Sequence, residues 1–503
     1  MKEVIRINEA DNVAVALTDI EKGSKVDVDG VQIVLLTNVP AGHKFALRDV
    51  KKGENVIKYG FPIGMALHDV ERGTWIDHHD IKTNLRGELN YDNVRIKQQL
   101  NSCQQISEAE QRTFLGYRRN DGRVGVRNEL WVIPTVGCVN GIVHNIVERV
   151  KALTNGASGV DDIVDFPHNY GCSQLGDDME NTRKILRDLV LHPNAGGVLV
   201  VGLGCENNQP KDFEKLLGNY DHDRIKFLLC QDVEGNEVET GVQMLMQLYK
   251  LASLDKRTDI PASELRIGLK CGGSDGFSGI TANPLLGAFS DWLCLCQGGT
   301  TILTEVPEMF GAETILMERC IDDNVLEQTK HLINNFKHYF LSHGQPVGEN
   351  PSPGNKAGGI STLEEKALGC TQKSGSASVC GVLGYGETLQ KRGLNLLSAP
   401  GNDLVAATAL AAAGCQIVLF TTGRGTPFAT AVPTLKVSSN SNLFRRKAGW
   451  IDFNAGSIAE DVSIRQLLPS FVNLVLDVAS GKKVKSEENG IHGMAIWKDG
   501  VTL

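Results

Sequence analysis

The chain has 503 residues, more than one hydrophobic core usually supports, so two or three domains are expected. Its net charge of -9 and the lack of a basic stripe argue against a nucleic-acid partner. No apolar run approaches the ~18 residues that span a membrane, and the N-terminus lacks the apolar core of a signal peptide. A cytoplasmic location is therefore expected, with the 12 cysteines as reduced thiols.

The first 80 residues contain an internal repeat, which predicts a small all-β module at residues 1–85. The segments "VALTDIEKGSKV", "FALRDVKKGENV" and "MALHDVERGTWI" each read as strand, turn and strand. An Asp opens each turn, where its side chain can bond its own backbone, and a glycine then permits a positive φ. The polar segment 86–112 is interpreted as a linker with some helix.

From residue 113 onward, strand-like runs alternate with helical stretches, which predicts an α/β fold with a parallel sheet. We assign residues 113–258 to a middle α/β domain and residues 259–503 to a C-terminal domain. The segment 340–375 interrupts the alternation; its Pro and Gly argue against regular structure, and we interpret it as a functional insertion or lid. The strands are predicted at 129–134, 162–166, 196–202, 224–230, 264–270, 299–304, 376–383, 394–398 and 416–421.

Polar, glycine-rich segments follow these strands, and ligands of open α/β sheets bind beyond the carboxyl ends of the strands. In "LKCGGSDGFSGITANP" (269–284) the glycines would let backbone N–H groups approach an anion. A tight turn with an Asp or Ser cap is the plainer explanation. We prefer a site, because one cap does not require so many polar residues. They are Cys271, Ser274, Asp275, Ser278 and Asn283.

Two further segments offer charged side chains. "TEVPEMFGAE" places Glu305 and Glu308 on one face if a helix starts there, where they could bind a hard cation or do acid–base work. An acid-rich helix N-terminus explains the pair equally well. Arg424 in "TTGRGTP" and Lys356 in "NPSPGNKAGG" suit an acidic substrate, although an isolated loop cation is usually only solvated.

Three cysteines, Cys138, Cys172 and Cys205, follow three successive predicted strands. They could converge on an iron ion or an iron–sulfur cluster. Their spacing matches no standard cluster sequence, so ordinary cysteines are the preferred interpretation. The "GLG" at 202–204 lacks the third glycine and the acidic partner of a dinucleotide site, which weakens a nicotinamide-binding interpretation.

The motifs "PTVGCVNG", "YGCSQLGDD", "GLGCENNQ", "LKCGGSDGFSGITANP", "TEVPEMFGAE", "SAPGND" and "TTGRGTP" together resemble the altronate/galactarate dehydratase family. The resemblance covers essentially the whole chain. It implies a cytoplasmic hydro-lyase of hexuronate breakdown that converts D-altronate to 2-dehydro-3-deoxy-D-gluconate and water, with iron or manganese. It also implies a β-clip module of the SAF type, a middle domain that contributes to a homodimer, and a Rossmann-like C-terminal domain that binds a metal.

Dehydration of a 2,3-dihydroxy acid removes the C2 proton beside a carboxylate and expels the C3 hydroxyl. A divalent metal and a cationic side chain can stabilise the second negative charge that develops on the carboxylate. A thiolate ligand favours iron(II) over magnesium, and manganese is the alternative. We therefore expect Arg424 to bind the substrate carboxylate, assisted by Ser274, Ser278 and Asn283. The expected metal ligands are Cys271, Asp275, Glu305 and Glu308.

The catalytic base is expected to be Lys356, or else His43 or His79 if the β-module folds over the site. For His79 the plainer role is that of a strand-end surface histidine, and a non-catalytic role is the more common one for any one of these three residues. The alternatives are another sugar acid such as galactarate or a sulfonated hydroxy acid as substrate, a nicotinamide-dependent oxidoreductase, or a sugar-acid binding protein without turnover.

Overall fold

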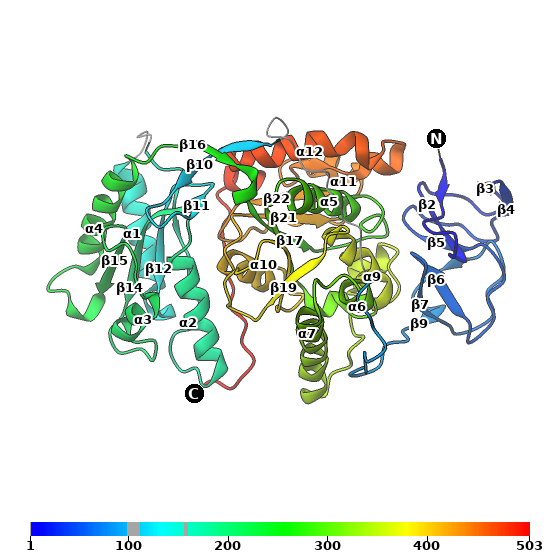
Figure 1. The fold of residues 1–503 in the computed structure, drawn as a ribbon, viewed down its shortest axis with the longest axis horizontal. Helices are drawn as coiled ribbons and strands as arrows, with labels where there is room; N and C mark the ends of the chain where they lie inside the picture. Colours follow the sequence, from blue (N-terminus) through cyan, green and yellow to red (C-terminus); the bar gives the residue numbers. More distant parts are fainter. Residues whose placement is uncertain (1, 98–110, 155–158) are drawn as a thin grey trace.

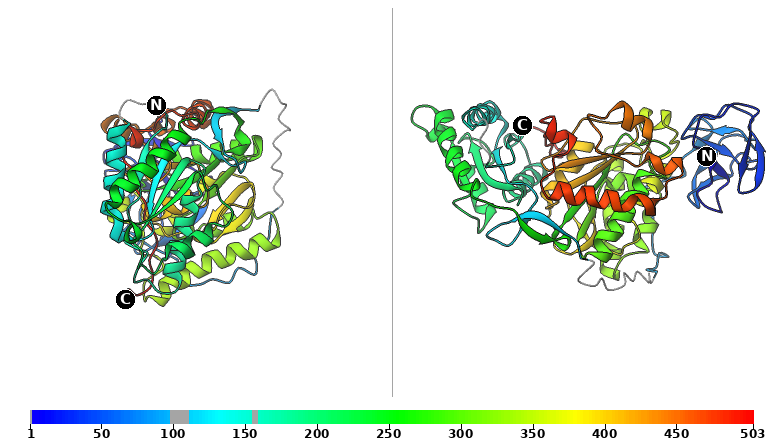
Figure 2. Two further views of the ribbon diagram at one scale, coloured as in Figure 1. Left: turned by 90° about the vertical axis from the view of Figure 1, so that its left-hand side faces the viewer. Right: turned by 90° about the horizontal axis from the view of Figure 1, so that it is seen from above.

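The computed structural model describes residues 2–97, 111–154 and 159–503. The chain forms three bodies in a row, with the N-terminal module at one end, the C-terminal domain in the centre and the middle domain at the other end (Figure 1). Figure 2 shows the same order from above. The polypeptide therefore passes the central body before it builds the middle domain, and then returns. Among the described residues, no helix is both long and apolar enough to cross a membrane.

The N-terminal module is all-β, as predicted. Its strands pair antiparallel in the orders β1-β2-β5-β8, β3-β4 and β6-β7-β9. Alternating exposed and buried side chains, as in β3, give each short strand one face toward a core. The strands are β1 (Val4–Ile5), β2 (Val13–Ala16), β3 (Lys25–Val28), β4 (Val31–Val34), β5 (Lys44–Ala46), β6 (Asn55–Lys58), β7 (Phe61–Ala66), β8 (Trp75–Ile76) and β9 (Ile81–Lys82).

The repeated Asp-containing turns of this module are cross-linked in a way that the sequence did not predict. Asp49 Oδ1 accepts a hydrogen bond of 2.9 Å from the backbone N–H of Arg72, and Asp69 Oδ1 accepts one of 2.9 Å from that of Lys52. Each Asp thus caps the turn of the other repeat instead of its own. The expected positive φ is present, at +84° to +85°, in the glycines of all three turns.

The segment after the module packs against the C-terminal domain. Residues 86–97 contain no helix, and Tyr91 is buried with its hydroxyl 2.7 Å from Glu313. Val94 and Ile96 pack against the large C-terminal core. This stretch is therefore held in place, whereas most of the predicted linker, 98–110, lies outside the described residues.

The middle domain has a four-stranded parallel sheet in the order β13-β12-β14-β15. Strand β12 coincides with its predicted range, and its residues alternate between two cores: Leu130 and Val132 face α1 and α4, while Trp131 and Ile133 face α2 and α3. An antiparallel ribbon, β11-β10-β16, joins this domain to the next. The elements are β10 (Thr113–Arg118), β11 (Val124–Gly125), β12 (Glu129–Pro134), α1 (Asn140–Leu153), β13 (Ile163–Asp165), α2 (Asp177–Val190), β14 (Ala195–Gly202), α3 (Pro210–Leu217), β15 (Ile225–Leu229), α4 (Glu237–Ala252) and β16 (Thr258–Pro261).

The C-terminal domain is built on seven parallel strands in the order β19-β20-β18-β17-β21-β22-β23, which confirms the α/β prediction. The last two strands were not among those predicted. The strands are β17 (Arg266–Cys271), β18 (Thr300–Leu303), β19 (Val379–Leu383), β20 (Gly393–Leu397), β21 (Ile417–Thr422), β22 (Thr434–Ser438) and β23 (Phe453–Asn454). The helices are α5 (Ala282–Asp291), α6 (Glu313–Met317), α7 (Asp323–Ser342), α8 (Pro353–Ala357), α9 (Leu363–Thr371), α10 (Asp403–Ala412), α11 (Ser441–Arg446), α12 (Ile464–Ala479) and α13 (Lys485–Glu488).

The segment 340–375 is largely regular, so the prediction that it lacks regular structure is wrong. It holds the end of α7, the short α8 and all of α9. Every residue of α9 is buried. A helix that is covered on all sides shows no apolar stripe, which is why the sequence pattern did not reveal it.

Helix α9 also anchors the N-terminal module. The carboxylate of Glu365 receives Lys44 at 2.9 Å and Lys58 at 2.7 Å, and all three side chains are at most 1% exposed. Ala367 and Leu368 join the apolar core of the module. The module is therefore attached through a buried ion-pair network in addition to an apolar contact.

Candidate functional site

The carboxyl ends of neighbouring strands β17, β18 and β20 meet at an open cleft with a volume of about 590 Å³. This is the edge at which ligands of open α/β sheets bind. The cleft lies between the loop after β17, the loop before α10 and the segment around α8. Its lining residues are Gly272, Gly273, Glu308, Glu349, Asn350, Pro351, Ser352, Pro353, Asn355, Lys356, Lys366, Gly401, Asn402 and Asp403.

Two thiols and one carboxylate gather below this cleft. The sulfur atoms of Cys271 and Cys370 lie 3.3 Å apart, and they lie 3.3 Å and 3.1 Å from Glu308 Oε2. Cys271 ends β17, Glu308 lies in the 3-10 helix Val306–Met309 after β18, and Cys370 comes from α9. We call Cys271, Glu308 and Cys370 the donor group. It reaches the cleft through Glu308, one of the lining residues.

Three buried lysines surround the donor group. Lys373 Nζ donates to Cys271 Sγ at 2.7 Å and to Glu305 Oε2 at 3.0 Å. Lys366 Nζ pairs with Glu308 Oε1 at 2.7 Å, and Lys270 pairs with Glu305. Lys366 and Cys370 are four residues apart on α9, so they share one face of that helix.

This surrounding charge separates the pKa values of the two carboxyls. Burial and the neighbouring Glu308 raise the pKa of Glu305, although Lys270 and Lys373 oppose the rise. Burial alone would also raise the pKa of Glu308, but Lys366, followed by Lys270 and Lys373, lowers it to about 2. Glu308 is therefore ionised at neutral pH.

The donor group fits a single metal ion. Its three donor atoms lie within 4.8 Å of one another. Ligands at about 2.0–2.3 Å from one ion can lie at most about 4.6 Å apart, so one ion could contact all three. Two thiols make the set soft, which favours iron over magnesium or calcium. Glu305 lies next to this group, but its carboxylate is bound by Lys270, by Lys373 and by the N–H of Cys271.

Asp275 lies apart from the donor group, so the four expected ligands do not share one centre. Asp275 Oδ1 accepts from Ser278 and from the Ser439 hydroxyl at 2.7 Å, and Oδ2 accepts from Asn440 at 3.0 Å. Burial nevertheless raises the pKa of this carboxyl. Because hydroxyl and amide donors already surround it, Asp275 holds loops together and does not face the cleft.

Two expected substrate contacts are also occupied. Ser278 bonds Asp275, and Asn283 bridges Gly369 at 2.9 Å and Thr421 at 2.6 Å. Both line a cavity of about 10 Å³, the size of one water molecule, so this geometry does not favour their binding of a sugar acid, which stays a prediction. Ser274 lines the same cavity with a buried hydroxyl that has no partner among the described residues.

The glycines after β17 allow a close contact with the N-terminal module, and this contact explains them better than anion binding does. A Cβ on Gly276 would overlap the carbonyl oxygen of Gly42, and one on Gly279 would overlap the Tyr59 hydroxyl. The N–H of Gly276 already donates to Gly358 at 2.7 Å. These glycines let the N-terminal module approach the backbone closely, a purpose that the sequence alone did not reveal.

The two expected cations lie near the mouth of the cleft. Lys356 in α8 is half-buried and lines it. Arg424 is exposed, and its backbone N–H donates to Gly273, a lining residue, at 2.9 Å. Arg424 thus lies beside the cleft without forming part of its lining.

The two expected histidines lie on the N-terminal module. His43 is buried against Trp75, and burial together with Lys44 lowers its pKa. His79 is exposed and, with Asp77 and His78, forms the second group of metal-type donors within 4.8 Å among the described residues. Neither histidine lines the cleft.

Sequence reasoning missed Cys370, Lys366 and Lys373. All three come from the buried segment that was interpreted as irregular. One signal was available: Cys370 follows Gly369, just as Cys138, Cys172 and Cys205 each follow a glycine.

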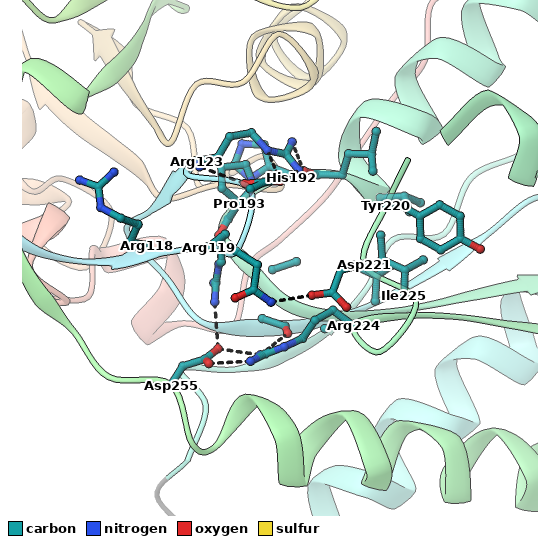
Figure 3. A pocket seen from close by; sticks show the side chains of 18 of the residues that line it. Arg118, Arg119, Arg123, His192, Pro193, Tyr220, Asp221, Arg224, Ile225 and Asp255 are labelled. Atoms are coloured by element: carbon teal, nitrogen blue, oxygen red, sulfur yellow. Dashed lines mark hydrogen bonds and ion pairs between the residues drawn. The ribbon is translucent and has the colours of Figure 1, made fainter. Parts of the chain in front are cut away.

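A second pocket, of about 400 Å³, lies at the amino edge of the middle-domain sheet. Figure 3 shows Arg119 and Arg224 both directed at Asp255, with which they pair at 3.0 Å and 2.7 Å. Arg123 pairs with Asp121. Arg119, Arg123 and Arg224 are therefore paired with carboxylates of the protein and are not free to bind an acidic substrate.

Comparison with known proteins identifies the family. Residues 2–84 match the model for the altronate/galactarate dehydratase SAF domain, residues 116–253 that for the second domain of D-galactarate dehydratase/altronate hydrolase, and residues 262–502 that for the C-terminal domain of D-galactarate/altronate dehydratase.

Three curated relatives extend over nearly the whole chain. It is 55% identical to altronate dehydratase of Bacillus subtilis and 53% identical to that of Escherichia coli, with 100% of both chains covered in each case. It is 35% identical to the L-threo-forming galactarate dehydratase of Escherichia coli, over 97% of this chain and 95% of that one. The chain therefore belongs to the altronate/galactarate dehydratase family.

Proposed function

We propose that the protein is a hydro-lyase that converts D-altronate to 2-dehydro-3-deoxy-D-gluconate and water. Two relatives of more than 50% identity over the full length carry the name altronate dehydratase, whereas the galactarate relative is at 35%. The observation that carries the proposal is the buried donor group, enclosed by three lysines and open to the cleft through Glu308.

The donor group would hold a divalent ion, iron(II) in preference to manganese, through Cys271, Glu308 and Cys370. When bound, the ion supplies Lewis-acid stabilisation of the negative charge that develops on the substrate. Lys366 fixes the Glu308 carboxylate at 2.7 Å and holds it ionised, so the carboxylate is available as a ligand. Lys373 Nζ lies 2.7 Å from Cys271 Sγ and holds this side chain in position.

Around this centre, the remaining side chains would bind substrate and move the proton. Arg424 would bind the substrate carboxylate; its backbone bond to Gly273, which lines the cleft, supports this role. Lys356 is the preferred base for the C2 proton, because it lines the cleft and has no side-chain partner among the described residues. His43 and His79 are less favoured, since neither lines the cleft.

The test is an anaerobic assay with D-altronate after addition of iron(II), with detection of the 2-keto product. Galactarate and a sulfonated hydroxy acid are the parallel substrates. Turnover of either one in preference to altronate would replace the proposed substrate. Absence of turnover together with saturable NAD binding would favour the nicotinamide-dependent alternative, and sugar-acid binding without turnover would favour a binding protein.

We also propose a cytoplasmic location and a homodimer. The composition supports the first, and the family resemblance supports the second. Size-exclusion chromatography with light scattering would test the dimer.

A further inference from the structure

The exposed cysteines of this protein are gathered in one place. Among the described residues, Cys138, Cys172 and Cys205 are the only cysteines that are exposed; the others are half-buried or buried. All three follow strands of the middle-domain sheet at its carboxyl edge. Free cysteine usually packs as a small buried hydrophobe, so this concentration of accessible thiols on one edge calls for a function.

The loops that carry these thiols are hydrogen-bonded to one another. The N–H of Gly137 donates to Tyr170 at 2.9 Å, and the N–H of Asn208 donates to Gly171 at 2.9 Å. Cys172 Sγ itself donates to Asn207 Oδ1 at 3.2 Å. The neighbours of each cysteine therefore touch the neighbours of another.

The backbone around these thiols is irregular. Cys138 lies in the 3-10 turn Gly137–Val139, which runs directly into the N-terminus of α1. Ser173 and Gly204 have φ of +58° and +128°, so the loops adopt uncommon conformations beside Cys172 and Cys205.

The spacing of the three thiols is too wide for one ion. Two thiolates on one ion at about 2.3 Å can be at most about 4.6 Å apart. The groups of described donors that lie mutually within 4.8 Å do not include these three cysteines. A cluster of several irons bridged by sulfide is larger than one ion and spans a wider set of thiolates.

We propose that Cys138, Cys172 and Cys205 hold an iron–sulfur cluster of the [4Fe–4S] type on the carboxyl edge of the middle-domain sheet. Three protein thiolates leave one iron without a cysteine, open to water or to another oxygen ligand. This centre is separate from the donor group of the C-terminal domain, and it does not depend on the reaction proposed above.

The test is anaerobic reconstitution of the full chain with equal amounts of ferrous and ferric iron and with sulfide, followed by desalting. The expected product has the broad visible absorption of an iron–sulfur cluster, an electron paramagnetic resonance signal after reduction, and about four iron and four sulfide per chain from this site. Absence of bound sulfide in the wild-type protein would overturn the proposal.

Variants locate the cluster. The substitutions Cys138→Ser, Cys172→Ser and Cys205→Ser should each abolish or strongly reduce bound sulfide, while these exposed positions should change stability by no more than about 0.5 kcal/mol. Cys230→Ser is the matched control, because this half-buried cysteine follows β15 at the same edge. Cys271→Ser should leave the sulfide content unchanged. Full sulfide in the three variants, or equal loss in Cys230→Ser, would contradict the assignment.

A second measurement does not depend on the variants. Reconstituted protein should protect Cys138, Cys172 and Cys205 from alkylation, as read by peptide mass spectrometry, and a chelator under anaerobic conditions should remove the protection. Rapid alkylation of all three in protein that carries bound sulfide would place the cluster elsewhere.

Discussion

Two parallel sheets of this chain end in cysteines, and their carboxyl edges differ in almost every other respect. At the C-terminal edge, Cys271 and Cys370 are buried, 3.3 Å apart and enclosed by lysines and carboxylates. At the middle edge, Cys138, Cys172 and Cys205 are exposed and more widely spaced. The same topological rule selects both edges. Burial, charge and spacing then decide that one suits a single ion and the other a cluster.

The strongest test of the C-terminal edge is Glu308→Gln. This change removes the charged donor and leaves a side chain of the same shape. We expect kcat to fall by about 10³-fold, because groups that stabilise developing charge are worth that much. Iron bound at this edge should fall in parallel, without loss of sulfide from the middle edge.

Glu460→Gln, at an exposed position in the same domain, is the control and should retain full turnover. If Glu308→Gln kept normal turnover and iron content, the donor group would not be the metal site. The C-terminal edge would then not be the single-ion site of the comparison.

The next test concerns Lys356, which lines the cleft. If this side chain removes the C2 proton, Lys356→Ala should lower kcat by about 10²-fold with little change in KM. Lys356→Arg separates the two roles, since it keeps the charge but is too basic to accept a proton.

A catalytic base predicts that both variants are slow and that the acidic limb of the pH profile moves, because the base must be deprotonated to act. Normal turnover of Lys356→Arg would instead assign Lys356 to binding of the substrate carboxylate. Normal turnover of Lys356→Ala would exclude it as the base.

Low pH should weaken the attachment of the N-terminal module to the C-terminal domain, because Glu365 holds the module in place. Burial would raise the pKa of Glu365, but Lys44 and Lys58 outweigh it and lower the pKa to about 2. The module thus gains stability above the unfolded pKa of about 4.3 and loses it as pH falls from about 4.5 toward 2. The loss should approach about 3 kcal/mol.

The measurement is protease cleavage in the linker as a function of pH, compared with Glu365→Gln. The variant should be cleaved more readily at neutral pH and should show little further change in acid. Asp69→Asn, which alters an exposed pair with Lys51, serves as the control because such pairs contribute only about 0–1 kcal/mol. Identical pH profiles for Glu365→Gln and wild type would refute this anchor.

The smallest effect is expected from alkylation of chelated, metal-free protein, which should not alter the fold. Cys138, Cys172 and Cys205 should react first, and Cys271 and Cys370 should react more slowly by at least about tenfold, since the structure must open to expose them. Peptide mass spectrometry gives the order. Equal rates at the two edges would mean that they do not differ in accessibility.

The sequence predicted most strands correctly because buried parallel strands are continuous apolar runs. β12, for example, coincides with "ELWVIP", all of whose residues are buried. The edge strand β23, of only two residues, was too short to be predicted. Helix α9 was missed because every residue of it is buried, so its polar residues did not mark a solvent face.

Cys271 and Glu308 were correctly expected to meet, since strand ends converge. Their partner Cys370 could not be placed, because it comes from a helix that inserts from outside the βα alternation. Asp275 and the glycines around it were assigned to ligand binding, whereas in the structure Asp275 holds loops of the C-terminal domain together and Gly276 and Gly279 contact the N-terminal module. A Gly-rich polar loop has the same composition in both roles, so only the distances separate them.

Helix α9 faces two ways at successive residues: Glu365 belongs to the seam with the N-terminal module, and Lys366 belongs to the cleft. Removal of the module would leave the Glu365 carboxylate without its lysine partners, next in sequence to Lys366, which positions Glu308. The buried lysines of the module, Lys44 and Lys58, therefore hold it to the C-terminal domain more than the connecting peptide does. If the chain is cut in the linker and supplied as two fragments, the fragments should associate again. The larger fragment alone should lack dehydratase activity.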